Sequence, residues 1–239
     1  MSSKGLDYFK KVYDQVPGWV QQMHDYSPNM LDQYTSLRGD IMKPGALSVK
    51  EKDILLVGMN AARLYERSMV YHTKGAIDGG ASLPELAEYL LVSYLYNGQQ
   101  ALLTGLKSMQ YACELVGDET LDRKNIDTVE EILCQYIQMI GSENAAFIEN
   151  VLQTKKDGGD MEEVILRDGH VSRKNKLLLM SGIYITVLNG KIAGTWMEKA
   201  RRSGAEEPEL AETGAICLLT AGIPAWFEAS DSLRMGHEQ

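Results

Sequence analysis

Apolar residues recur at helical spacing along much of the chain. In "LDYFKKVYDQV" they fall at Leu6, Phe9, Val12, Tyr13 and Val16, and in "VEEILCQYIQMI" at Val129, Leu133, Tyr136, Ile137 and Ile140. Intervals of three and four residues place these side chains on one face of a helix. No alternating, strand-like run has comparable quality, so the pattern predicts an all-α fold.

An internal repeat appears when the chain is aligned with itself at an offset of 124 residues. "GASLPELAEYL", which starts at Gly80, then matches "GAEEPELAETG", which starts at Gly204, and the alignment continues without a gap in both directions. Self-similarity of this kind indicates duplicated units. We predict two tandem helical repeats that form a pseudo-twofold bundle, a first over 1–120 and a degenerate second over 121–239, with polar residues 117–128 as the boundary.

The repeated segment also predicts where its helices begin and end. Ser82 can cap a helix whose third residue, Glu85, closes a capping box, and Pro84 suits the first turn. Gly79 and Gly80 supply a stop for the preceding helix. We therefore expect a long helix from about Ser48 to these glycines, a second helix from Leu83 and a break at Gly98.

Charge and cysteine content narrow the classes of function. The net charge is −9 and the sequence pI about 5.0, which argues against a nucleic-acid partner, because phosphate backbones are bound by clustered basic residues. No apolar stretch is long enough to span a bilayer and the N-terminus lacks a signal-peptide pattern. The three cysteines match neither a zinc site nor a redox pair. We expect a cytoplasmic protein without a membrane partner.

The stretch "VKEKDILLVGMNAARLYERSMVYHTKGAIDGGASLPELAEYLL" resembles the carboxymuconolactone decarboxylase and alkylhydroperoxidase D superfamily. The core unit of that family reads Lys-x-(Arg/Lys)-Glu-Leu-Ile, then a CxxC pair, a histidine four residues on, and Gly-Ala-x-x-Glu-Glu-Ile. The resemblance covers 45–110 well and 170–230 more weakly. It implies paired helical units that assemble as symmetric homo-oligomers, which for a tandem chain would be trimers or dimers.

The residues of the family's site carry over unevenly. His72 stands on the family histidine and Asp53 on the relay glutamate, whereas Tyr65 and Ser68 replace the two cysteines. Peroxide reduction needs a low-pKa thiolate with a resolving thiol, which tyrosine and serine do not provide. An alkylhydroperoxidase or peroxiredoxin-like antioxidant is therefore the weakest reading. In the second repeat the matching positions hold none of the titratable groups of this site: Leu177, Asn189, Ile192 and Trp196.

A histidine backed by a carboxylate is the common arrangement for a general base. We predict a catalytic site of His72, Asp53, Tyr65 and Ser68, with Arg63 and Arg67 binding the substrate, and with no cofactor and no metal. The expected chemistry is proton transfer on a small acidic or cyclic substrate, with decarboxylation or lactone reactions as examples and a lyase as the leading class. The alternative is a non-catalytic protein that binds a small ligand or serves as an oligomeric interaction module, since a single histidine on an apolar helix is often a core residue.

Overall fold

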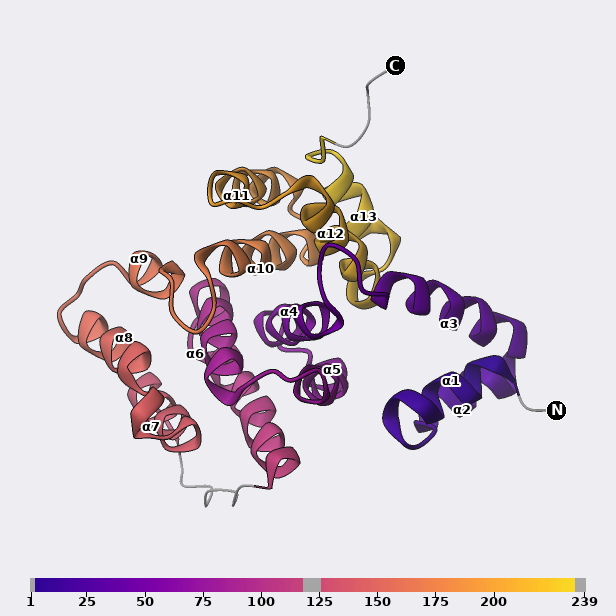
Figure 1. Ribbon diagram of the computed structural model, residues 1–239, viewed down its shortest axis with the longest axis horizontal. Helices are drawn as coiled ribbons and strands as arrows, with labels where there is room; N and C mark the ends of the chain where they lie inside the picture. Colours follow the sequence, from indigo (N-terminus) through magenta and orange to yellow (C-terminus); the bar gives the residue numbers. More distant parts are fainter. Residues whose placement is uncertain (1–2, 118–125, 235–239) are drawn as a thin grey trace. The chain divides into compact units, whose positions relative to one another are not determined.

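A computed structural model describes residues 3–117 and 126–234 of the chain, and all regular secondary structure in these ranges is helical (Figure 1). The all-α prediction is therefore confirmed. Helix α7 covers the same twelve residues as the predicted "VEEILCQYIQMI". The elements are α1 (Lys4–Tyr13), α2 (Gly18–Tyr26), α3 (Pro28–Met42), α4 (Val49–Ala62), α5 (Glu66–Asp78), α6 (Leu83–Val116), α7 (Val129–Ile140), η1 (Ser142–Asn144), α8 (Ala146–Lys156), α9 (Met161–Leu166), α10 (Arg173–Thr186), α11 (Gly190–Arg202), α12 (Glu207–Ala221) and α13 (Ile223–Ser230).

Helices α1, α2 and α3 belong to a compact N-terminal unit that extends to Gly45. Its core is aromatic: the fully buried ring of Phe9 meets that of Trp19 edge-on at 5.0 Å between centroids. The Arg38 guanidinium donates to the hydroxyl of Tyr13 at 2.9 Å and lies near the rings of α1. This unit thus has a core of its own, as a compact folding unit requires.

The remaining chain forms a second unit, from Ala46 onward, in which α4, α5 and α6 pack together. Helix α6 begins as predicted, with the Ser82 and Glu85 capping box, and bends at Gly98, whose φ is +59°. The predicted single long helix from Ser48 to Gly79 is wrong. Leu64 has a φ of +60°, outside the helical region, so the chain makes two helices, α4 and α5.

The bounds of α4, α5 and the start of α6 recur in α10, α11 and α12 at the offset of 124 that the sequence predicts. The helix break recurs as well, because Leu188 has a φ of +58° where Leu64 has +60°. Gly204 likewise matches Gly80, with φ values of +90° and +89°. These matches support the duplication, which stays an interpretation of the sequence.

Two reciprocal ion pairs join these two sets of helices within one chain. Lys52 of α4 pairs with Glu212 of α12 at 2.9 Å, and Lys176 of α10 pairs with Glu88 of α6 at 2.7 Å. Each carboxylate also accepts two backbone N–H groups from the segment before the opposite helix: Ala46 and Leu47 donate to Glu212, and His170 and Val171 to Glu88. The two sets therefore contact each other in the same way in both directions.

The ion pair and hydrogen bonds of Glu212 predict that the folded protein loses stability in acid. Burial raises the pKa of this carboxyl, but its bonds to the Leu47 N–H, Lys52 and the Ala46 N–H outweigh burial and hold the pKa below its ordinary value. A lowered folded-state pKa contributes stability that is present above the unfolded pKa of about 4.3 and is lost as pH falls through the folded pKa. Thermal unfolding between pH 6 and 3 should show a smaller decline in Glu212→Gln than in the wild type. Glu149→Gln, at an exposed position on α8, should keep the wild-type slope.

The predicted division of the chain between residues 120 and 121 lies outside the described residues, as does most of the polar segment 117–128. The compact units that the structure defines instead meet between Gly45 and Ala46. No helix within 3–117 and 126–234 is long and apolar enough to cross a membrane.

Candidate functional site

Asp53 and His72 form a buried pair at the centre of the predicted site. Asp53 lies on α4 and His72 on α5, and Oδ1 of the aspartate is 2.8 Å from Nδ1 of the imidazole. Each residue is 5% exposed. The structure thus brings together two side chains, nineteen positions apart, that helix geometry alone could not place side by side.

Local sequence explains how the two helices come this close. Gly75 on α5 faces Asp53, and a Cβ at this glycine would collide with the aspartate carboxylate. The Ser48 and Glu51 capping box fixes the start of α4, and the break at Leu64 folds α5 back against it. A carboxylate only accepts hydrogen bonds, so Nδ1 of His72 carries the hydrogen and Nε2 of the neutral ring is unprotonated.

The imidazole is therefore arranged as a base. Among the described residues, Asp53 is the only hydrogen-bond partner of the His72 ring, which leaves Nε2 to exchange a proton with another molecule. Protonation of the ring would create an imidazolium that the Asp53 carboxylate stabilises. The pair can act as a base in one step and return the proton in the next.

Tyr65 and Ser68 stand in the place of the family's two cysteines, and within the described ranges neither side chain forms a hydrogen bond with Asp53 or His72. Tyr65 precedes α5 as its N-cap residue and is 47% exposed, and no hydrogen bond of its hydroxyl is found in the described ranges. Ser68 is half-buried on the first turn of α5, where its Oγ is 3.4 Å from the amide nitrogen of Asn60. Ser68 and His72 share α5, whereas Tyr65 lies just before it, because α5 begins at Glu66.

The two predicted substrate-binding arginines differ in their surroundings. Arg63 is half-buried, and its NH1 donates to the Thr220 carbonyl at 2.8 Å and to the Thr220 hydroxyl at 3.0 Å. It therefore ties the end of α4 to α12. Arg67 lies exposed on α5, where its guanidinium remains able to meet a ligand.

Sequence reasoning missed a polar connection from the second repeat to this region. The Thr220 hydroxyl of α12 donates to Oδ1 of Asn60 at 2.6 Å, and the Asn60 amide donates to the Leu56 carbonyl and approaches Ser68. Asn60 is fully buried. A buried asparagine on an otherwise apolar helix was the signal that could have indicated this network.

The cysteines offer no replacement for the missing dithiol. All three are free, and only Cys134 is exposed. Burial raises the pKa of the Cys217 thiol, which donates to the Thr213 carbonyl at 3.1 Å, so this thiol stays protonated and unreactive. In the described part of the chain, no group of three histidine, cysteine or acidic residues could hold a metal ion.

In the second repeat the positions that match Asp53 and His72 hold apolar and aromatic side chains. Leu177 stands in the place of Asp53 and is 1% exposed, and Trp196 stands in the place of His72. The Trp196 ring stacks on Tyr184 and lies under the Lys199 ammonium at 3.8 Å. This half of the molecule therefore provides packing where the first half provides the acid and the base.

Residues 28–110 match the model of the carboxymuconolactone decarboxylase family. The match contains α4, α5 and the Asp53 and His72 pair, and it supports the superfamily that this segment resembles. No curated protein matches the chain.

A crystal structure from Burkholderia xenovorans LB400, itself assigned only provisionally as a carboxymuconolactone decarboxylase, is similar at 26% identity and a TM-score of 0.44. The similarity covers 47% of this chain and 89% of that one. A TM-score this low does not establish a common fold.

Proposed function

We propose that the first repeat is a cofactor-free enzyme that transfers protons on a small acidic or cyclic substrate, in decarboxylation or a lactone reaction. The observation that carries the proposal is the buried 2.8 Å contact between Asp53 and His72. The match of 28–110 to the carboxymuconolactone decarboxylase family supports the same class.

The proposed steps use the two nitrogens of His72 differently. Nδ1–H stays bonded to Asp53, while Nε2 removes a proton from the carbon next to a carbonyl, and the electron pair moves onto the carbonyl oxygen as an enolate. In a decarboxylation, Nε2 instead takes the proton of the substrate's carboxylic acid. The resulting carboxylate leaves as CO₂, the electron pair of the broken C–C bond forms the enolate, and protonated His72 then donates its proton to carbon. Arg67 would hold the substrate carboxylate, while Tyr65 would donate a hydrogen bond to the developing oxyanion and Ser68 would orient the substrate.

Replacing the carboxylate tests the proposal. Asp53→Asn keeps the shape of the side chain. The asparagine no longer fixes the His72 tautomer whose Nε2 is unprotonated, and it no longer stabilises the imidazolium. We expect kcat on a panel of carboxylated lactones and β-keto acids to fall by about 10²-fold or more. Asp78→Asn, at an exposed position of α5 where the aspartate pairs with Lys74, is the matched control and should keep wild-type kcat. Equal rates in Asp53→Asn and the wild type would exclude the proposed pair.

The second candidate is a protein that binds a small acid without turnover. The 5% exposure of His72 favours it, because a base must reach its substrate. Under this alternative the panel acids bind, as measured by calorimetry, but none is consumed by the wild type. Homo-oligomerisation as a dimer or trimer stays a proposal for both candidates, and sedimentation velocity would measure it.

A further inference from the structure

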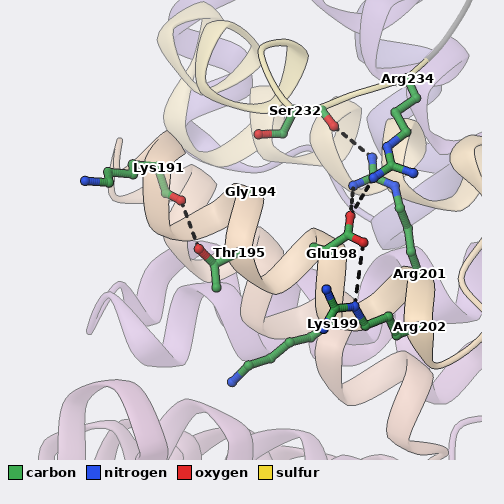
Figure 2. Close-up of a pocket in the computed structure, with 9 residues that line it drawn as sticks. All are labelled: Lys191, Gly194, Thr195, Glu198, Lys199, Arg201, Arg202, Ser232 and Arg234. Atoms are coloured by element: carbon green, nitrogen blue, oxygen red, sulfur yellow. Dashed lines mark hydrogen bonds and ion pairs between the residues drawn. The ribbon is translucent and has the colours of Figure 1, made fainter.

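A groove of about 600 Å³ lies along one side of α11, in the half of the molecule that lacks the acid and base pair (Figure 2). Residues of α11 at helical spacing form one wall, and the segment after α13 forms the other. Figure 2 shows four of its basic side chains around this space: Lys191, Arg201, Arg202 and Arg234.

Two glycines allow the opposite wall to approach α11. A Cβ at Gly194 would collide with the Ser232 hydroxyl, and one at Gly190 with the Glu228 carboxylate. The Gly190 N–H donates to that carboxylate at 2.8 Å. The groove is thus defined by a fixed approach of two segments, rather than by arginines scattered over a surface.

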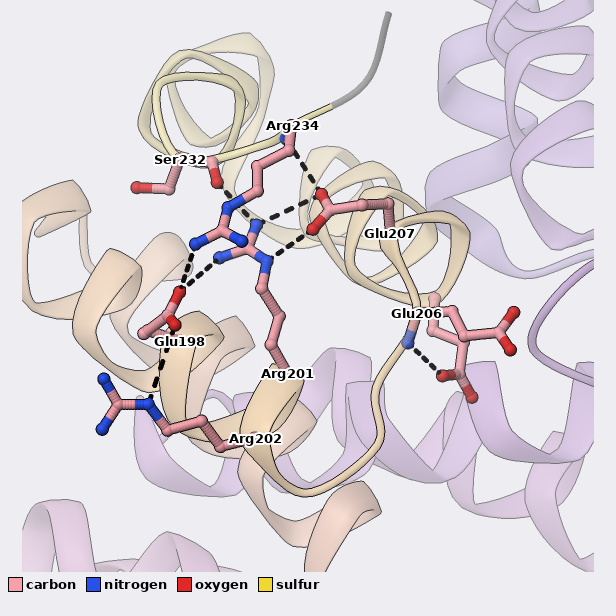
Figure 3. Close-up of polar contacts among 8 residues, drawn as sticks. Glu198, Arg201, Arg202, Glu206, Glu207, Ser232 and Arg234 are labelled. Carbon is pink, nitrogen blue, oxygen red and sulfur yellow. Dashed lines mark hydrogen bonds and ion pairs between the residues drawn. The ribbon is translucent and has the colours of Figure 1, made fainter.

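Arg201 holds the wall after α13 in place, as Figure 3 shows. Its guanidinium is 12% exposed, donates to both oxygens of Glu207 and donates to the Ser232 carbonyl at 2.7 Å. The hydrogen bonding of Arg201 to Glu207 is the largest cause of the raised pKa of Arg201, and the same contact lowers the pKa of Glu207. Arg201 is therefore structural, and its charge is balanced by Glu207.

Arg202 and Arg234, unlike Arg201, are exposed to solvent. Their side chains are 78% and 64% exposed, and across the described residues Glu198 is the only side chain that pairs with either guanidinium. Arg234 donates one hydrogen bond to Glu198 at 2.7 Å, whereas Nε of Arg202 lies 3.7 Å from it. Glu198 also accepts a hydrogen bond from Arg201 at 3.4 Å, so one carboxylate faces three guanidinium groups. Arg202 and Arg234 keep most of their donors, in a chain with a net charge of −9.

The first repeat has no equivalent of this arrangement. At the offset of 124 residues, Glu198, Arg201, Arg202 and Arg234 correspond to Lys74, Ile77, Asp78 and Gln110. Gly194 corresponds to Val70, which carries a side chain where Gly194 has none. The guanidinium groups and the glycine that admits them are therefore features of the second repeat alone.

We propose that this groove binds a small polyanion through Arg202 and Arg234, with Lys191 toward its other end. Guanidinium groups donate paired, planar hydrogen bonds that match phosphate and carboxylate oxygens. Phosphates and carboxylates both fit these donors. Inorganic pyrophosphate therefore serves as the phosphate probe and citrate as the carboxylate probe. The site is separate from Asp53 and His72 and does not depend on the proposed catalysis.

Calorimetry with the full chain, in buffer of about 20 mM ionic strength, tests the proposal. We expect saturable 1:1 binding of at least one probe, and weaker binding in about 0.5 M salt because exposed charges are screened. Arg202→Gln/Arg234→Gln should weaken binding about tenfold, since each exposed charged contact contributes up to a few-fold in affinity. Stronger binding of pyrophosphate would identify phosphate as the preferred chemistry, and stronger binding of citrate would identify carboxylate.

The matched control is Lys10→Gln/Lys11→Gln, which removes two exposed positive charges from α1. This variant should bind like the wild type, and circular dichroism should show that both double variants are folded. Three results would each overturn the proposal: no saturable binding of either probe, undiminished binding by the Arg202→Gln/Arg234→Gln variant, or equal losses in both double variants. His72→Gln should bind the probes normally, which separates this site from the proposed catalysis.

Discussion

Glu88→Gln should reduce the free energy of unfolding by about 3–5 kcal/mol, the typical cost of leaving one member of a buried ion pair without its partner. The Lys176 side chain is fully buried and that of Glu88 is 2% exposed. The glutamine keeps the volume and one acceptor oxygen for the N–H groups of His170 and Val171, so the main loss is the negative charge. Urea unfolding at pH 7 would measure the difference.

The same variant should recover stability as the pH rises. Burial is the largest influence on Lys176 and lowers its pKa even beside Glu88, and without the carboxylate the folded-state pKa falls further. Between this lowered pKa and the ordinary lysine pKa of about 10.4, the unfolded chain binds more protons than the folded chain, so stability increases with pH over that range. The deficit of Glu88→Gln relative to the wild type should therefore be smaller at pH 9 than at pH 7.

Two further variants separate the charge from the packing. Glu88→Gln/Lys176→Met removes both charges and should regain most of the lost stability, because an uncharged buried pair no longer pays for desolvation. Glu212→Gln changes the reciprocal pair, in which the lysine is 3% exposed but the carboxylate is 26% exposed, and should cost less than Glu88→Gln because water reaches this pair. A loss as large in Glu212→Gln as in Glu88→Gln would contradict this explanation.

The second large effect concerns activity. His72→Gln removes the only group that accepts a proton in the proposed mechanism, and we expect kcat on any substrate that the wild type turns over to fall by about 10²–10⁴-fold. Glutamine can still bond to Asp53, so the fold should persist. The measurement is a pH–rate profile of both proteins, in which the wild type rises with deprotonation of the imidazole and the variant lacks that limb.

The control for this variant lies on the same helix. Ser68→Ala removes a hydroxyl that contacts Asn60 rather than His72, so it should change KM or kcat by much less and leave the pH profile in place. Unchanged turnover in His72→Gln would rule out the base and favour the ligand-binding alternative.

Much of the fold was predictable because its signals are local. The capping box at Ser82 and the bend at Gly98 depend on residues a few positions apart, and the structure has both. The break at Leu64 was not predictable in the same way. Leucine rarely adopts a positive φ, and here α5 folds back onto α4 and α6, so tertiary packing determined the conformation.

The candidate site was likewise predictable from the sequence only in part. His72 and Asp53 were identified by their positions in a family motif, and the structure places them in contact. The catalytic roles of these residues, of Tyr65 and of Ser68 stay predictions. Thr220 reaches Asn60 from a helix 160 positions away. The asparagine could indicate a polar network, but its partner depends on how the two repeats pack.

The glycine that faces Asp53 has a consequence for the history of the second repeat. Lys199 stands where Gly75 stands in the first, and its side chain now lies over Trp196. Restoring Asp at Leu177 and His at Trp196 would set the new carboxylate against the Lys199 Cβ, because only a glycine leaves room at that position. A third change, at Lys199, would be required before the first two could bring any benefit. An acid and base pair could therefore not be built in this half by substitutions at Leu177 and Trp196 alone.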